Sequence, residues 1–281
     1  MSIPSPSQET PSAMPRVYLL PNLMTAGNLF CGFMATIQII AGSLGQQVGS
    51  ENWIAHYEAS LKFILFAFIF DMLDGRLARL GGRESSFGRE FDSLADLISF
   101  GLAPALLVVK IVLADFRWVG GLVAFVYLVA GAMRLARFNL VSSQPGGSVT
   151  KDFVGFPIPA AAGLVASITL FMLTLYENDR EPGRWRYALP FLLLFLSFMM
   201  YSKISYPSFK SIDWHSRRSI PQVLLTFIFL ILLAKTWRYS LALVFLLYLT
   251  YGFVRPFISK RIREGIEEDD DSPEQDANGA A

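Results

Sequence analysis

The stretch that decides how this chain is interpreted is Asp71-Met72-Leu73-Asp74-Gly75-Arg76-Leu77-Ala78-Arg79, continued by Gly88, Asp92 and Asp96. It places four carboxylates inside a region that is otherwise apolar enough for a membrane span. One Asp at the centre of a membrane helix costs about 2.5–3.5 kcal/mol on insertion scales, so four without a partner cost roughly 10 kcal/mol. A divalent cation is the simplest group that offsets this cost, and we therefore predict a metal site.

The spacing of the carboxylates predicts that they converge. Asp71 and Asp74 lie three residues apart on one helix face, and Asp92 and Asp96 lie four apart on a face of the next helix. Gly81-Gly82 supplies the turn that two antiparallel helices require. Carboxylate oxygens are hard ligands, which suit Mg²⁺ or Mn²⁺ rather than zinc.

The pattern Asp71-x2-Asp74-Gly75-x2-Ala78-Arg79-x8-Gly88-x3-Asp92-x3-Asp96 resembles the signature of the CDP-alcohol phosphatidyltransferases at every fixed position. It fixes eight identities over 26 positions, so a chance match is rare. Enzymes of that family transfer a phosphatidyl group from CDP-diacylglycerol to an alcohol and release CMP. A cation-carrying transporter and a purely structural cluster are the alternatives that the four carboxylates leave open.

The resemblance implies a role for each of these residues. It makes Asp71, Asp74 and Asp92 metal ligands, and it makes Asp96 the base for the acceptor hydroxyl and a further metal contact. The residues that it assigns to CDP-diacylglycerol are Gly75, Arg79 and Ser85, with Ser86 as a rival to Ser85. Asn28 is polar within an apolar helix and faces either the nucleotide or a neighbouring helix; the nucleotide is favoured.

Four further segments resemble the bacterial phosphatidylserine synthase branch of the family: residues 21–32, 134–139, 155–163 and 206–210. This implies L-serine as the acceptor, with choline, glycerol phosphate and inositol phosphate as alternatives. Arg134 and Arg137 have the charge to bind the serine carboxylate, and Asn139 could add a hydrogen bond. The competing interpretation is that both arginines cap a helix C-terminus and follow the positive-inside rule.

The composition predicts an all-α, polytopic membrane bundle. Hydrophobic residues make up 53 % of the 281 residues, and the mean hydropathy is +0.43. Apolar runs long enough to span a bilayer predict eight transmembrane helices. They cover residues 22–43, 60–81, 91–113, 118–138, 157–176, 187–204, 219–235 and 238–256. The active site is expected between the second and third of them.

The basic residues predict the orientation of this bundle. With the N-terminus inside, sixteen of the 24 Lys and Arg residues fall on the cytoplasmic side. We therefore expect an inner (plasma) membrane protein with both termini and the carboxylates at the cytoplasmic side. The membrane domain is expected at 15–263, between disordered tails at 1–14 and 264–281. The chain has no nucleic-acid motif, and the sequence leaves a homodimer open.

Overall fold

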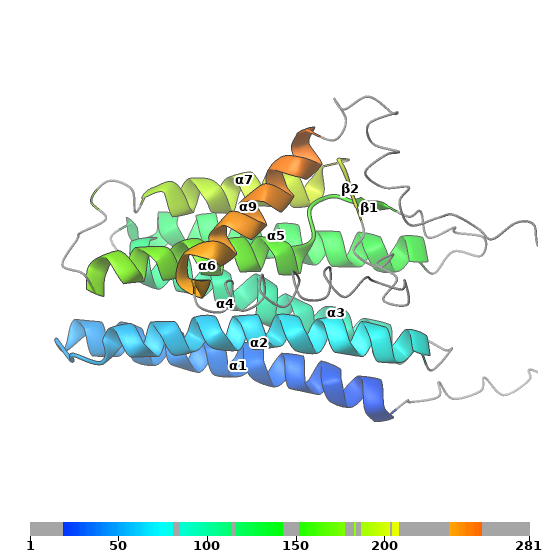
Figure 1. Cartoon of the computed structure of the whole chain (residues 1–281), viewed down its shortest axis with the longest axis horizontal. Helices are drawn as coiled ribbons and strands as arrows, with labels where there is room; N and C mark the ends of the chain where they lie inside the picture. The colour runs from blue at the N-terminus through cyan, green and yellow to red at the C-terminus, as the bar shows by residue number, and fades with distance from the viewer. Residues whose placement is uncertain are drawn as a thin grey trace, which may run out of the picture.

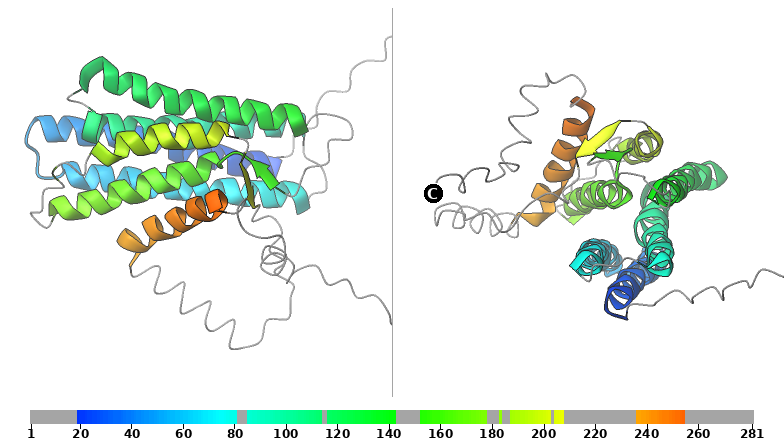
Figure 2. Two further views of the ribbon diagram at one scale, coloured as in Figure 1. Left: turned by 90° about the horizontal axis from the view of Figure 1, so that it is seen from above. Right: turned by 90° about the vertical axis from the view of Figure 1, so that its right-hand side faces the viewer.

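The computed structural model describes residues 19–80, 85–113, 116–142, 152–177, 183, 187–202, 204–207 and 236–254. Within these ranges the chain forms a bundle of long helices that run roughly side by side (Figure 1). The tails expected at 1–14 and 264–281 lie outside them, as does the Gly81-Gly82 turn. The end-on view in Figure 2 shows α9 inclined to the other helices.

The first two helices, α1 (Leu19–Gln47) and α2 (Trp53–Leu80), form an antiparallel pair. Their connection contains Gly49, whose φ of 69° is in the left-handed region that favours glycine. Small residues allow the two helices to approach closely. A Cβ at Gly42, for example, would lie 3.2 Å from the ring of Tyr57. Helix α1 contains the segment 21–32, and α2 contains Asp71 and Asp74.

The next element is one continuous helix that contains two wide, π-helical turns. It runs through α3 (Ser86–Asp96), η1 (Leu97–Leu102), α4 (Ala103–Val108) and η2 (Val109–Leu113). Pro104 has no N–H to donate to the carbonyl of Phe100 four residues earlier. The buried hydroxyl of Tyr127 donates to that carbonyl instead, at 3.0 Å. A neighbouring helix therefore satisfies the backbone group that proline leaves without its usual donor.

The remaining helices are α5 (Arg117–Ser142), α6 (Ile158–Glu177), α7 (Ala188–Tyr201) and α9 (Trp237–Val254). Among the five helices that are long and apolar enough to cross a membrane, α6 is the most enclosed. In its most apolar stretch, 78 % of the residues are buried. Its many small side chains, such as Ala161 and Ala162, allow neighbouring helices to pack closely around it.

The all-α prediction is confirmed for the described residues, which contain beside the helices only a small antiparallel sheet at the end of the bundle where α2 ends and α3 begins (Figure 1). Strand β1 (Asp152–Val154) pairs with β2 (Ser205–Pro207), with Phe153 opposite Tyr206. Gly155 follows β1 with a φ of 86°, and its N–H donates to the carbonyl of Ile204 at 2.9 Å. Strands of three residues are too short to show an alternating pattern in the sequence, which is why they were not predicted.

Five described helices are long and apolar enough to cross a membrane: Leu19–Gln47, Trp53–Leu77, Ser86–Leu113, Trp118–Val141 and Ile158–Glu177. They correspond to the first five spans that the sequence predicts. The helices found near 187–204 and 238–256 are shorter apolar elements, Ala188–Tyr201 and Ser240–Tyr251. The expected span at 219–235 lies outside the described residues, so the count of eight stays a prediction.

Candidate active site

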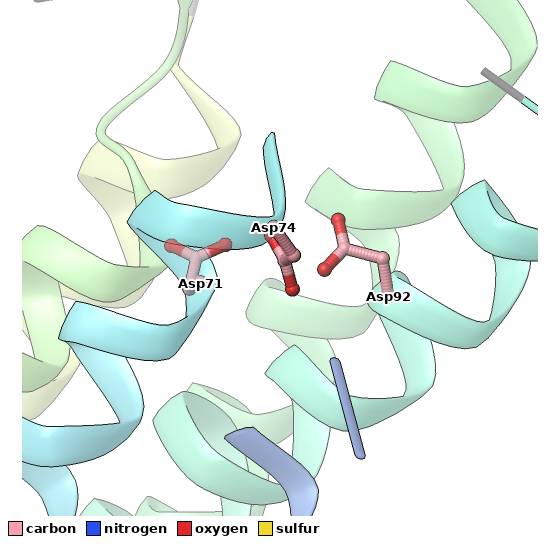
Figure 3. A group of neighbouring side chains, drawn as sticks. All are labelled: Asp71, Asp74 and Asp92. Atoms are coloured by element: carbon pink, nitrogen blue, oxygen red, sulfur yellow. The ribbon is translucent and has the colours of Figure 1, made fainter. Parts of the chain in front are cut away.

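Three carboxylates meet between α2 and α3. Asp71, Asp74 and Asp92 each offer one oxygen, and these oxygens all lie within 4.8 Å of one another. Figure 3 shows the first two on α2, with Asp92 pointing toward them from α3. Asp74 is only 4 % exposed, and the other two are half-buried. The convergence predicted from the spacing is therefore present for these three residues.

The fourth carboxylate, Asp96, lies one helical turn beyond Asp92 and outside this group of three. It is 6 % exposed, and its charge interacts with those of Asp71 and Asp92. The structure therefore brings Asp96 near the cluster of Asp71, Asp74 and Asp92 without making it a member of that cluster.

The N-terminus of α3 explains how the third carboxylate reaches its place. The Ser85 hydroxyl caps the helix by accepting a hydrogen bond of 2.9 Å from the N–H of Gly88. A Cβ at Gly88 would lie 3.0 Å from that hydroxyl and 3.2 Å from Oδ1 of Asn22 on α1. Glycine at this position thus lets α1 and the start of α3 approach each other. Ser85 has a structural role here, beside its predicted contact with the nucleotide.

Helix α1 contributes two polar side chains to the cluster. The Thr25 hydroxyl donates to Oδ2 of Asp74 at 3.0 Å, and the Asn28 amide donates to Oδ1 of Asp96 at 2.9 Å. Both side chains are buried, at 3 % and 0 % exposure. Asn28 therefore faces a carboxylate on a neighbouring helix, one of the two surroundings expected for it. Thr25 was not predicted, although it lies three residues before Asn28 on the same face.

The two arginines of α5 lie in different surroundings. Arg134 is 8 % exposed, and its charge interacts with that of Asp96. Its Nε has no hydrogen-bond partner among the described residues. Arg137 is half-buried, and its guanidinium lies 6.0 Å from the ring centre of Tyr201 on α7.

The interpretation that Arg134 and Arg137 cap the C-terminus of a helix is wrong. Helix α5 continues to Ser142, and its last turn holds no basic residue.

Asn139 has a different environment from the one that its place near Arg137 suggested. Its amide donates to Glu90 at 3.2 Å and to the hydroxyl of Ser93 at 3.0 Å, both on α3. Asn139 therefore links α5 by hydrogen bonds to α3, the helix that carries Asp92. A hydrogen bond to an acceptor alcohol is not needed to explain why a polar side chain is buried at this position.

Two residues expected to contact the nucleotide are placed less completely. Gly75 lies on α2 next to Asp74 and is half-buried. The backbone of Arg79 belongs to the last turns of α2, and its side chain lies outside what the structure describes. Residues 81–84, which follow α2 in the chain, lie outside the described residues.

The donor set fits a hard divalent cation. Three carboxylate oxygens within 4.8 Å of one another offer only oxygen ligands and a negative charge. The Asp74 carboxylate accepts hydrogen bonds from the Thr25 hydroxyl and from the Gly75 backbone, which hold it in place beside the other two. Mg²⁺ and Mn²⁺ prefer such carboxylate oxygens, whereas zinc is more often bound through sulfur and nitrogen.

Comparison with known proteins agrees with this chemistry. Residues 18–252 match the family model described as CDP-alcohol phosphatidyltransferase. A CDP-diacylglycerol–serine O-phosphatidyltransferase of Helicobacter pylori is 37 % identical over 85 % of this chain and 91 % of its own length. The enzyme of the same name from Bacillus subtilis is 31 % identical over 68 % of this chain and 91 % of its own. An archaetidylserine synthase of Methanothermobacter thermautotrophicus is 35 % identical over 67 % and 69 %.

Proposed function

Because the chain belongs to the CDP-alcohol phosphatidyltransferase family, we propose that it transfers the phosphatidyl group of CDP-diacylglycerol to L-serine. The products are phosphatidylserine and CMP, as in phospholipid biosynthesis. The observation that carries the proposal is the meeting of Asp71, Asp74 and Asp92 between α2 and α3. A family match alone would give the reaction class, whereas this geometry supplies the place where a pyrophosphate and its cation can be held.

Asp71, Asp74 and Asp92 would hold the Mg²⁺ or Mn²⁺, and Asp96, one helical turn beyond Asp92, is proposed as a further metal contact. When bound, such an ion offsets the charge of the pyrophosphate and orients it for phosphoryl transfer. The role of the carboxylates is to fix the cation at the polar end of two membrane helices. The choice between the two ions is left to titration.

Asp96 is the proposed base. Its Oδ1 accepts a hydrogen bond from the Asn28 amide, and the carboxylate is proposed to take the proton of the acceptor hydroxyl. The serine hydroxyl oxygen forms a bond to the phosphorus that carries diacylglycerol, and the bond from that phosphorus to the CMP oxygen breaks. The hydroxyl proton passes to Asp96, and CMP leaves with the electron pair. A carboxylate is a weak base for an alcohol, so positioning must supply much of the rate.

The nucleotide is proposed to lie along the end of α2 and the start of α3. Gly75 leaves room for it to approach the backbone, and the Arg79 guanidinium suits its phosphates. Ser85 stands at the N-terminus of α3, where backbone N–H groups and the helix dipole favour an anion. Asn28 is the fourth residue that the sequence assigns to this substrate.

The serine carboxylate is proposed to bind at Arg134, with Arg137 as the second candidate. Arg134 supports this role best because it is buried close to Asp96 and its Nε has no partner among the described side chains. A buried cation in a membrane span is costly, and such groups usually serve function. Choline has no carboxylate and would gain nothing from this residue.

The bilayer orientation is also proposed. The carboxylates lie at the end of the bundle that holds the N-terminus of α1 and the C-termini of α2 and α5, seen together in Figure 1. We place this end at the cytoplasmic face of the inner membrane because the basic residues favour it. A cysteine at Ser86 should be labelled only from the cytoplasm and one at Glu51 only from outside, after Cys31 is replaced by Ala. Outside labelling at Ser86 would invert this orientation.

The assay that tests the function uses purified protein, CDP-diacylglycerol and labelled serine, choline, glycerol phosphate or inositol phosphate. Formation of phosphatidylserine with an equal amount of CMP is expected, and only with serine. A different labelled lipid would keep the reaction class and change the acceptor. Metal transport into liposomes without CMP release would support the cation-carrier alternative and overturn the proposal.

A further inference from the structure

One face of α1 touches both helices that carry the carboxylates. Thr25 and Asn28 lie three residues apart, so they point to the same side of the helix. The first contacts Asp74 on α2, and the second contacts Asp96 on α3. A single rigid element thus holds one carboxylate from each half of the motif.

The contact between Thr25 and Asp74 holds one oxygen of the carboxylate, Oδ2. The Thr25 hydroxyl has one proton and two acceptors in range, the carbonyl of Pro21 at 3.2 Å and Oδ2 of Asp74 at 3.0 Å. An ionised carboxylate is the stronger acceptor. Groups that hold a metal-binding side chain in this way commonly raise metal affinity by 10–100-fold.

The contact between Asn28 and Asp96 has only one chemical assignment. An ionised carboxylate can only accept hydrogen bonds, so the amide nitrogen of Asn28 must face it. The backbone of Asn28 is anchored as well, because its carbonyl accepts a hydrogen bond of 2.9 Å from the Ser99 hydroxyl. One turn along α1, Gly32 allows this close approach: a Cβ there would lie 2.7 Å from Cα of Ser99.

We propose that Thr25 and Asn28 are positioning residues that orient the carboxylates of Asp74 and Asp96 from α1. Thr25 sets the metal-binding oxygen of Asp74, and Asn28 sets the carboxylate that takes the proton. For Asn28 this role replaces the predicted contact with the nucleotide. The Asn28 half rests on the proposed function, whereas the Thr25 half needs only a metal site.

The Thr25 half is tested by titrating purified protein with Mn²⁺ and measuring free ion by electron paramagnetic resonance. Thr25→Val keeps the shape and removes the hydroxyl, and it should raise the Kd for Mn²⁺ by about 10–100-fold. Thr25→Ser should restore the affinity. Thr36→Val is the matched control, because among the described residues that hydroxyl donates within α1, to the carbonyl of Gly32 at 3.0 Å. Equal Mn²⁺ affinity in Thr25→Val and wild type would overturn this half.

The Asn28 half is tested by steady-state kinetics with CDP-diacylglycerol and serine. Asn28→Leu should lower kcat by roughly 100-fold, the cost of a misplaced catalytic group, with the KM for CDP-diacylglycerol unchanged. A raised KM for CDP-diacylglycerol with little change in kcat would instead establish the nucleotide contact and overturn this half.

Gln38→Leu is the control for Asn28→Leu. Gln38 lies about 15 Å from Asn28 along α1, and its substitution removes a side-chain contact with His56 on α2. Its kcat should match that of wild type. If wild-type protein released no CMP, the proposed function would fail, and the Mn²⁺ titration would still decide the role of Thr25.

Discussion

The two halves of the α1–α2 pair bury polar groups in opposite ways. In the half near the connecting turn, Nδ1 of His56 lies 2.8 Å from Oε1 of Gln38, and the Ser60 hydroxyl donates to the carbonyl of Tyr57 at 2.7 Å. In the other half, Asp71 and Asp74 are gathered with Asp92 within 4.8 Å. The first half pairs the neutral groups named here with each other or with the backbone, whereas the second concentrates like charges.

This difference separates a structural polar contact from a binding site. A hydrogen bond between two neutral side chains closes on itself and adds about 0.5–1.5 kcal/mol. Three carboxylates facing one another repel, and each disfavours ionisation of the others. A bound cation relieves this repulsion, whereas the neutral contacts named in the turn half need no ligand. The predictions that follow are ordered by the size of the expected effect.

Removing a carboxylate should have the largest effect. Asp71→Ala, Asp74→Ala and Asp92→Ala should each abolish activity, because each removes one of the three carboxylates proposed to hold the cation. Insertion should be retained, and the melting temperature should be close to that of metal-free wild type, since the change also removes repulsion. CMP release and melting temperature are measured on the same preparations. Normal turnover in any of the three would contradict the assignment of that residue.

Metal removal should silence the wild-type protein and destabilise it together. A chelator should stop CMP release, and Mg²⁺ or Mn²⁺ should restore it. At an ion concentration 100 times the Kd, binding adds about 2.7 kcal/mol to the stability of the folded state. The added stability, measured by thermal unfolding in detergent, should disappear in Asp71→Ala. Full activity in metal-free buffer would remove the distinction between the two halves.

Arg134→Gln should raise the KM for serine by roughly 10–100-fold, because a charge-assisted hydrogen bond worth about 1.5–3 kcal/mol is lost. The KM for CDP-diacylglycerol should stay the same. Arg137→Gln is the comparison, since that side chain lies over Tyr201. An unchanged KM for serine in both variants would take these arginines out of the acceptor pocket.

The smallest effect is expected in the turn half. His56→Leu should lower the free energy of unfolding by about 1 kcal/mol, because the contact with Gln38 is lost. The rate of CMP release should match that of wild type in detergent and in vesicles. A large loss of activity would show that the two halves of the α1–α2 pair are coupled, against the separation argued above.

The sequence predicts what local spacing determines and misses what depends on contacts between distant segments. Asp71, Asp74 and Asp92 could be brought together on paper because helical periodicity fixes a face and one turn joins the two helices. Thr25 could not, since a threonine in an apolar run is ordinary until its partner on another helix is known. The role of Arg134 as a buried group beside Asp96 likewise required the packing of α5.

The wide turns of the third helix were beyond sequence reasoning for a related reason. Nothing in Leu97–Leu102 differs in composition from an ordinary membrane helix. Only Pro104 marks the place, and the donor that replaces its missing N–H comes from Tyr127, 23 positions further on. The short sheet depends on the same kind of distant pairing, between residues before α6 and residues after α7.

The η1 segment has a consequence for how this span tolerates changes in chain length. A π-helical turn holds one residue more than an α-helical turn, and each residue of an α-helix advances the chain by about 100° around the axis. Deleting one residue from Leu97–Leu102 would restore ordinary α-helical winding and rotate α3 relative to α4 by about that angle. Asp92 and Asp96 would then turn away from α2, while α4 remained packed in the core. The extra residue is thus an angular offset between the catalytic end of the span and its buried anchor.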